Sequence, residues 1–171
     1  MLCYRIRART KESINMEFRL LSKVFKNGEL IPDLYSNTRL GKNISPPLNW
    51  ENPPERTKYF ALIVEDVDAP IVGIISHWVL YNIPSEKREL REGIPQQESF
   101  SDGTIQGKNF FNRNVYMGPN PPFGTHRYYF RIFALDAKIK LNPKMTRKKL
   151  LKAIEQHVLG QAQLMSLYSK K

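Results

Sequence analysis

With 171 residues, the chain is long enough for one domain of ordinary size, and its 25% charged residues are typical of a soluble globular protein. No apolar run approaches the roughly 18 residues that a membrane-spanning helix needs. The single cysteine, Cys3, cannot form an intramolecular disulfide, which fits a reducing interior, and we expect a cytoplasmic location. The formal net charge of +11 favours anionic partners such as nucleic acid, phospholipid head groups or acidic proteins, with a solvated lysine surface as the plain alternative.

The first fifteen residues differ in character from the rest of the chain. Apolar residues alternate with arginines from Tyr4 to Arg9, a pattern compatible with a short strand, but no continuous apolar stretch typical of a signal peptide is present. We expect residues 1–15 to be a flexible N-terminal extension and residues 16–171 to form a single domain.

Strand patterns begin directly after this extension. Residues Glu17 to Lys26 roughly alternate, and Asn27-Gly28 is a strong turn signal. After a proline-containing segment, Trp50 is expected in the core. The apolar run Tyr59 to Val64 is typical of a strand covered on both faces, and it leads into the acidic segment Glu65 to Pro70.

The next strand is predicted over Ile74 to Ile83. Simple alternation places His77 on one face with Val79 and Tyr81. Residues 85–111 are polar and glycine-spaced, so we expect a long surface connection with one short helical turn.

The most informative stretch runs from Gly118 to Asp136. Its prolines and glycines predict a stiff loop, and the alternation after this loop predicts a strand. His126 and Tyr128 then share one strand face, while Arg127 lies on the other face with Asp68 as a candidate partner. Polar side chains are therefore held at the mouth of a pocket.

Helix is expected mainly near the C-terminus. Residues 138–141 are expected to complete the strand region, and Thr146 is a good N-cap. One helical stripe is predicted by Leu150, Leu151, Ile154, Val158 and Leu159, and a further amphipathic helix by Leu164, Met165, Leu167 and Tyr168. The basic residues between Lys144 and Lys152 oppose the helix dipole, and they form either a solvated face or a patch for anions or membranes.

Several motifs together resemble the phosphatidylethanolamine-binding protein family, in its bacterial and archaeal Raf-kinase-inhibitor-like branch. They are SPPLNW, DVDAP, HWVLYNIP, REGIP, QGKN and GPNPPFGTHRYYF, in the family's order, and the resemblance spans Met16 to Tyr168. It implies a mainly β fold, an antiparallel Greek-key β-sandwich with a C-terminal helical segment. It also implies a ligand site lined by Asp66, Pro70, His77, Pro122, His126 and Tyr128.

The chain departs from the family at the rim of this site. Val67 stands where the family usually has proline, and Phe111 to Arg113 and Val115 to Met117 stand where it often has glycine. We therefore expect a pocket rim of a different shape.

The residue types at the implied site indicate binding. Two imidazoles and the Tyr128 hydroxyl can donate to a phosphate or carboxylate, and Asp66 can orient one imidazole or accept from an ammonium group. We therefore expect a pocket for an anionic small molecule or a phosphoethanolamine head group, without cofactor or metal. The alternative is a protease or kinase inhibitor that acts through a surface outside the pocket.

Other readings have less support in the residues. A hydrolase would need a serine nucleophile, but no GxSxG elbow is present. A metal site from Asp66, Asp68, His77 and His126 lacks ligand-spacing motifs, and nucleic-acid binding rests on charge alone. Peripheral membrane contact and a homodimer are further expectations.

Overall fold

Alternating and continuous apolar runs in the middle of the chain form paired strands. The computed structural model describes residues 16–140, 142 and 144–170, so the predicted N-terminal extension lies outside the described residues. The elements are β1 (Arg19–Leu21), the 3-10 helix η1 (Asp33–Tyr35), β2 (Leu48–Glu51), β3 (Tyr59–Ala69), β4 (Gly73–Pro84), β5 (Glu89–Leu90), β6 (Ile105–Gln106), β7 (Thr125–Leu135), α1 (Arg147–Ile154) and β8 (Val158–Ser169).

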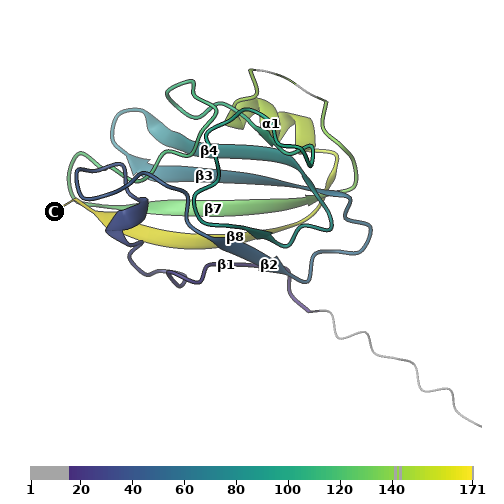
Figure 1. Ribbon diagram of the computed structural model, residues 1–171, viewed down its shortest axis with the longest axis horizontal. Helices are drawn as coiled ribbons and strands as arrows, with labels where there is room; N and C mark the ends of the chain where they lie inside the picture. The colour runs from purple at the N-terminus through teal and green to yellow at the C-terminus, as the bar shows by residue number, and fades with distance from the viewer. Residues whose placement is uncertain (1–15, 141, 143, 171) are drawn as a thin grey trace, which may run out of the picture.

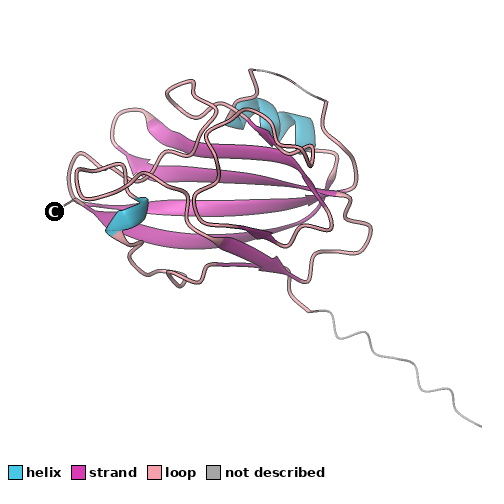
Figure 2. Cartoon of the chain, viewed as in Figure 1, coloured by secondary structure: helices cyan, strands magenta, loops and turns pink. Residues whose placement is uncertain are grey.

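These strands form two antiparallel sheets. The smaller sheet has the order β1-β2-β5, and the larger has the order β6-β4-β3-β7-β8 (Figures 1 and 2). The smaller sheet packs on one face of the larger sheet, and α1 lies on the other face. This arrangement confirms the predicted mainly β, antiparallel sandwich with a helix near the C-terminus.

The apolar run in β3 is explained by burial on both faces. Phe60, Leu62 and Val64 belong to the core between the two sheets. Ala61 and Ile63 belong to a second cluster that α1 covers. Strand β3 is central in the larger sheet, paired with β4 on one side and β7 on the other. Polar side chains at the end of β3 are therefore held in place by two neighbouring strands.

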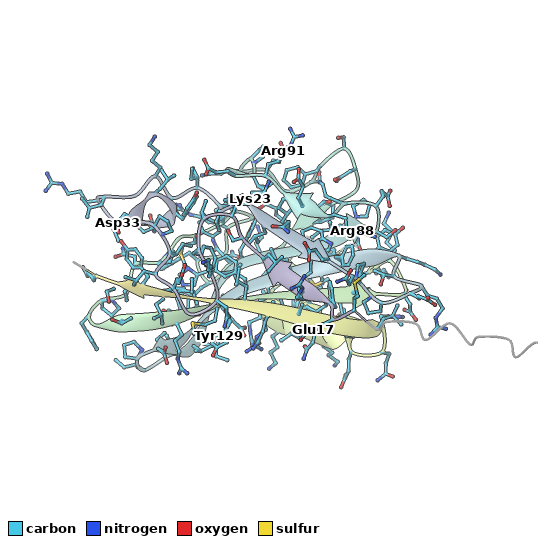
Figure 3. All side chains as sticks on the ribbon, turned by 90° about the horizontal axis from the view of Figure 1, so that it is seen from below. Glu17, Lys23, Asp33, Arg88, Arg91 and Tyr129 are labelled. Carbon is cyan, nitrogen blue, oxygen red and sulfur yellow. The ribbon has the colours of Figure 1, made fainter. Side chains whose placement is uncertain are left out.

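The smaller sheet closes the first of these cores. Trp50 is buried, as predicted, and its ring packs edge-on against Phe60 at a centroid distance of 5.3 Å. Exposed charged side chains such as Lys23, Arg88 and Arg91 lie over this sheet (Figure 3). The smaller sheet therefore covers much of this face of the larger sheet and presents its charged side chains to solvent.

Helix α1 closes the second core and is tied to the sheet by charge. Thr146 caps its N-terminus by accepting from the Lys149 amide, as predicted. The Arg147 guanidinium donates to the buried Glu65 carboxylate of β3, which also pairs with Arg131 at 3.0 Å. One of the basic residues that oppose the helix dipole is therefore fixed by a buried partner.

The C-terminal segment is a strand, so the predicted further helix is wrong. Strand β8 pairs with β7 over its whole length, and its even-numbered residues from Ala162 to Tyr168 are buried. The α1 stripe consequently ends at Ile154, and Val158 and Leu159 belong to β8. The apolar residues from Leu164 to Tyr168 fit the helical period of 3.6 as well as the strand period of 2, and pairing with the open edge of β7 decided for the strand.

Three smaller expectations also differ from the structure. The first strand is confined to Arg19–Leu21 rather than reaching Lys26, although the turn at Asn27-Gly28 is present. Residues 136–140 lie outside any strand, and Leu141 lies outside the described residues. The connection over 85–111 contains the short strands β5 and β6 and no helical turn.

Candidate functional site

The predicted site residues gather where β3 ends and β7 begins. The antiparallel register pairs Asp66 of β3 with Tyr128 of β7, so His126 lies one same-face position beyond this pair. Strand β4 begins at the same end, after the turn that follows Ala69. The three central strands of the larger sheet, β4, β3 and β7, therefore bring polar side chains together at one end of the sandwich.

His77 reaches this edge through an irregularity in β4. Val64 pairs with Trp78 but Glu65 pairs with Ser76, which leaves His77 as an extra residue on β4. Simple alternation placed His77 with Val79 and Tyr81, whose side chains pack under α1. The bulge turns His77 to the opposite face, where its ring meets Tyr128 edge-on at 5.2 Å.

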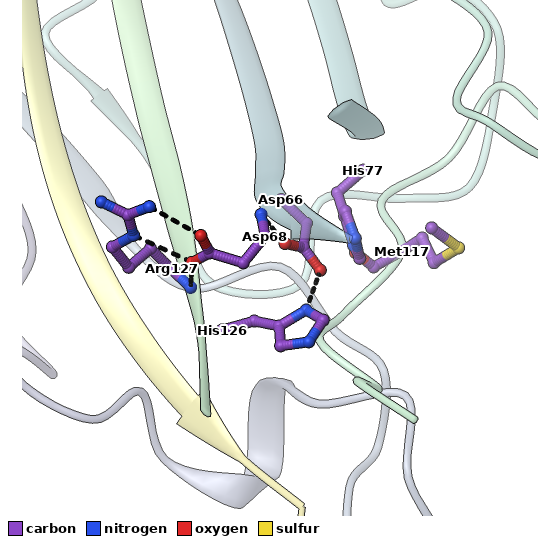
Figure 4. A network of polar contacts seen from close by, with 6 residues as sticks. All are labelled: Asp66, Asp68, His77, Met117, His126 and Arg127. Atoms are coloured by element: carbon purple, nitrogen blue, oxygen red, sulfur yellow. Dashed lines mark hydrogen bonds and ion pairs between the residues drawn. The ribbon is translucent and has the colours of Figure 1, made fainter. Parts of the chain in front are cut away.

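His126 and Asp66 form a buried pair. The Nδ1 atom of His126 lies 2.7 Å from Oδ2 of Asp66, and both side chains are almost fully buried (Figure 4). The other carboxylate oxygen of Asp66 accepts from the Asp68 amide at 2.9 Å. This local turn fixes the carboxylate even though Val67 replaces the family's proline, and it orients the imidazole so that Nε2 is the ring nitrogen left for a ligand.

Asp68 and Arg127 form the outer support of this pair, as predicted. The guanidinium donates two hydrogen bonds to the carboxylate, at 2.9 and 2.6 Å, and the Arg127 amide donates a third at 2.8 Å. Hydrogen bonding to Arg127 lowers the pKa of Asp68 to about 2. This clamp joins the end of β3 to the start of β7 on the solvent side of the site (Figure 4).

His77 is held as a neutral ring with a defined tautomer. Its Nδ1 atom lies 2.7 Å from the Met117 carbonyl oxygen, which can only accept, so Nδ1 carries the proton. Burial holds the pKa of His77 below its ordinary value, and the hydrogen bond to Met117 opposes this only in part. The free Nε2 atom is therefore an acceptor, whereas the sequence had suggested that both histidines donate.

Tyr128 contributes a buried hydroxyl that makes no short, well-aligned hydrogen bond with a described residue, although the Asp66 carboxylate and the Asn120 backbone are its polar neighbours. Burial, followed by the negative charge of Asp66, holds its pKa above the ordinary value, so the group stays protonated. A buried hydroxyl without a partner is costly unless a ligand or water satisfies it. This hydroxyl is therefore a weakly engaged donor that can turn to a ligand in the cavity.

The wall opposite these side chains is the proline-rich loop. Gly118 packs so closely against the preceding loop that a Cβ there would lie 2.1 Å from the Tyr35 carbonyl oxygen. Its amide donates to Asn43 at 2.7 Å, which ties two loops together. Gly124 adopts a φ of 68°, a conformation that favours glycine, where the loop turns into β7. The wall is therefore fixed before any ligand arrives.

All six predicted site residues line one cavity of about 260 Å³. Its walls are formed by Asn37, Asp66, Ala69, Pro70, Ile75, His77, Phe111, Met117, Gly118, Asn120, Pro121, Pro122, His126 and Tyr128. The motifs did not indicate Asn37, because it comes from a distant loop. Phe111 was indicated only as a departure from the family, and it is an exposed side chain at the rim.

In the described part of the chain, the single α-helix, α1, is too short to cross a bilayer, and no other helix is long and apolar enough.

Comparisons with known proteins agree with this architecture. A family model described as phosphatidylethanolamine-binding protein matches residues 21–169. A UPF0098 protein of Methanothermobacter thermautotrophicus is 42% identical, with 88% of this chain and 98% of the relative covered. A UPF0098 protein of Aquifex aeolicus is 46% identical, with 88% of each covered.

Solved structures show the same likeness in three dimensions. CT736 of Chlamydia trachomatis, described as a phosphatidylethanolamine-binding protein homolog, is 35% identical with a TM-score of 0.82, over 90% of this chain and 98% of that one. YbcL of E. coli, described as a new member of the mammalian PEBP family, is 29% identical with a TM-score of 0.82, over 91% and 100%. This chain therefore belongs to the phosphatidylethanolamine-binding protein family, with bacterial and archaeal relatives, and its membership supports a ligand-binding role.

Proposed function

We propose that the cavity binds a small phosphate ester, with the phosphoethanolamine head group as the best-fitting candidate. The observation that carries this proposal is the set of polar atoms left for a ligand. The Tyr128 hydroxyl makes no well-aligned hydrogen bond with a described residue, and both site histidines use Nδ1 within the protein. Three fixed polar groups thus converge on a small cavity, as in sites that orient a ligand by few but well-placed contacts.

The size of the cavity supports a head group rather than a larger metabolite. A volume of about 260 Å³ is below the roughly 300–1,000 Å³ of pockets for drug-sized ligands. The cavity is also lined by apolar side chains that are less buried than its polar groups, among them half-buried Ile75 and exposed Phe111. A compact polar group therefore fits inside, and a less polar remainder of the ligand extends past the rim.

The hydrogen-bonding capacity favours a ligand that both accepts and donates. The Tyr128 hydroxyl donates to a phosphate oxygen, and Nε2 of His126 is the second candidate contact for it. The Nε2 atom of neutral His77 accepts, and thus fits a P–OH group or an ammonium group. A phosphoethanolamine zwitterion carries both kinds of group, whereas a fully ionised anion offers no donor to His77.

Isothermal titration calorimetry with phosphoethanolamine tests the proposal, with methyl phosphate and ethanolamine as partial ligands. His126→Ala is expected to weaken binding by roughly tenfold or more, because a hydrogen bond to a charged group contributes about 1.5–3 kcal/mol. Tyr128→Phe is expected to weaken binding with little loss of folding stability, because the hydroxyl makes no well-aligned hydrogen bond in the free protein.

Tyr116→Phe is the matched control. The Tyr116 hydroxyl is also buried, but it donates to the Tyr35 carbonyl at 3.1 Å and does not line the cavity. This variant should lose about 1 kcal/mol of stability and keep its affinity. Unchanged affinity in both His126→Ala and Tyr128→Phe, or no heat at millimolar ligand in the wild type, would refute the proposed site.

A further inference from the structure

Large apolar side chains are exposed around the mouth of the cavity. Phe111 lines the cavity with 64% of its surface exposed, and Phe110 beside it is 48% exposed. The full set of exposed large apolar residues in the three segments that border the cavity is Ile71, Val72, Ile74, Phe110, Phe111 and Phe123. Such gathering is unusual on a surface whose apolar residues are normally scattered, and it marks an interaction site.

Ile71 is the sharpest case, because nothing within the fold explains it. Its side chain is fully exposed, and its backbone φ is 70°. A β-branched residue in this left-handed region is strained, since glycine, asparagine or aspartate are the residues that tolerate it. A residue that gains no burial and costs backbone strain is the kind of departure that occurs at functional sites.

Except for Ile74, which lies at the start of β4, these apolar residues occupy the tips of separate loops at one end of the sandwich. Ile71 and Val72 form the turn between β3 and β4, and Phe123 lies in the loop that enters β7. The β3–β4 turn, the loop before β7 and the C-terminus lie together at the left end in Figure 1. Exposed apolar side chains on several separate loop tips can each enter a deformable apolar phase such as the boundary layer of a lipid surface.

Positive charge borders the same end. Arg113 follows the Phe110–Phe111 tip, and the amide of Lys170 approaches the Gly124 carbonyl beside Phe123. Lys42 is adjacent to Asn43, which accepts from the Gly118 amide in the cavity wall. All three cations are exposed, and none forms an ion pair with a described residue. The carboxylates of the site, Asp66 and Asp68, are both already paired.

We propose that this end of the molecule docks on an anionic phospholipid surface. The apolar tips enter the boundary between head groups and acyl chains, and the bordering cations face the anionic head groups. Docking in this way turns the cavity mouth toward the layer of head groups. The proposed function gives the reason for such docking, since it supplies the cavity with a head group. The docking residues Ile71, Phe110 and Phe123 themselves lie outside the cavity lining.

Co-sedimentation of the full chain with phosphatidylcholine vesicles, with and without phosphatidylglycerol, tests the docking. We expect binding to the anionic vesicles that weakens as salt is raised, because screening reduces the charge attraction. Ile71→Asn and Phe123→Ser should each weaken binding roughly tenfold, the effect of withdrawing one large apolar side chain from burial. Because asparagine tolerates the left-handed conformation, Ile71→Asn should unfold at the same or a higher denaturant concentration than the wild type.

Controls at the far end of the sandwich isolate the surface. Val158 is an exposed apolar residue that pairs with Leu135, at the opposite end of β7 from the cavity. Val158→Ser should leave vesicle binding unchanged. Arg113→Glu should weaken binding more than Lys58→Glu, which makes the same change in net charge beside Leu135.

Vesicles without phosphatidylethanolamine keep the two proposals separate. Loss of phosphoethanolamine binding in His126→Ala, with vesicle binding retained, is the expected result. If wild-type protein does not sediment with anionic vesicles, the exposed tips serve a protein partner and the docking proposal is overturned, whatever the cavity binds. Equal weakening in Val158→Ser and Ile71→Asn would overturn it as well.

Discussion

The neutral state of buried His77 predicts a loss of folding stability in mild acid. In the unfolded chain this imidazole titrates near pH 6.5, whereas burial holds the pKa of the folded group below that value. Below pH 6.5 the unfolded state therefore binds more protons than the folded state, and stability falls as pH falls. The contribution of His77 is fully present above pH 6.5 and is lost progressively below it.

The magnitude is set by the titration of the unfolded chain. Between pH 7.5 and pH 5.5, a group that ionises at 6.5 only when unfolded lowers the free energy of unfolding by up to about 1.4 kcal/mol. His77 is only 4% exposed, so solvent screening does not reduce this figure much. The effect is superimposed on the titrations of other groups, and it therefore has to be measured as a difference between variants.

Urea denaturation of the wild type and of His77→Asn at both pH values measures that difference. Asparagine keeps a donor for the Met117 carbonyl but does not titrate, so the variant should lose the His77 part of the pH dependence whatever its absolute stability. His157→Asn is the control, since its half-exposed ring pairs with Asp136 at 3.0 Å. An unchanged pH dependence in His77→Asn would refute the assignment of a neutral, buried His77.

Two further substitutions test how the site is supported. Arg147→Met should lower the free energy of unfolding by about 2–4 kcal/mol in chemical denaturation, because it takes one of two partners from the buried Glu65 carboxylate. Lys148→Met, on the exposed face of the helix, should change it by less than about 0.5 kcal/mol. Equal effects of the two substitutions would show that the Glu65 contact does not stabilise the fold. Gly118→Ala should weaken phosphoethanolamine binding and lower stability together, since its Cβ would collide with the Tyr35 carbonyl, and calorimetry that found neither change would show that the loop is not fixed by this contact.

Motifs and periodicity predicted the sandwich because the signals in the centre of the chain are strong. The β3 run has strand length and no polar interruption, and the alternation in β7 is clear. Near the C-terminus the same method was wrong, since the residues from Leu164 to Tyr168 fit either period. The partner that decided the outcome, β7, is distant in sequence and invisible to a local window.

At the site, alternation misplaced His77, whereas the six residues that the resemblance implied all line one cavity. Strict alternation put His77 on the face of the sheet that α1 covers. Only the bulge opposite Val64 and Glu65 turns its side chain to the other face, where it meets Tyr128. A bulge adds one residue without a composition signal of its own, so no count of apolar residues reveals it. Its tautomer was equally hidden, because it depends on the Met117 carbonyl, forty residues away.

Imidazole ¹H–¹⁵N NMR during a phosphoethanolamine titration tests the central claim most directly. The free protein should show His77 protonated at Nδ1 and neutral near pH 7. Saturable ligand binding should then shift the Nε2 resonances of His77 and His126 and leave His157 unchanged, because only the first two line the cavity. Saturable binding that leaves both site imidazoles unperturbed would contradict the assignment of this cavity as the binding site.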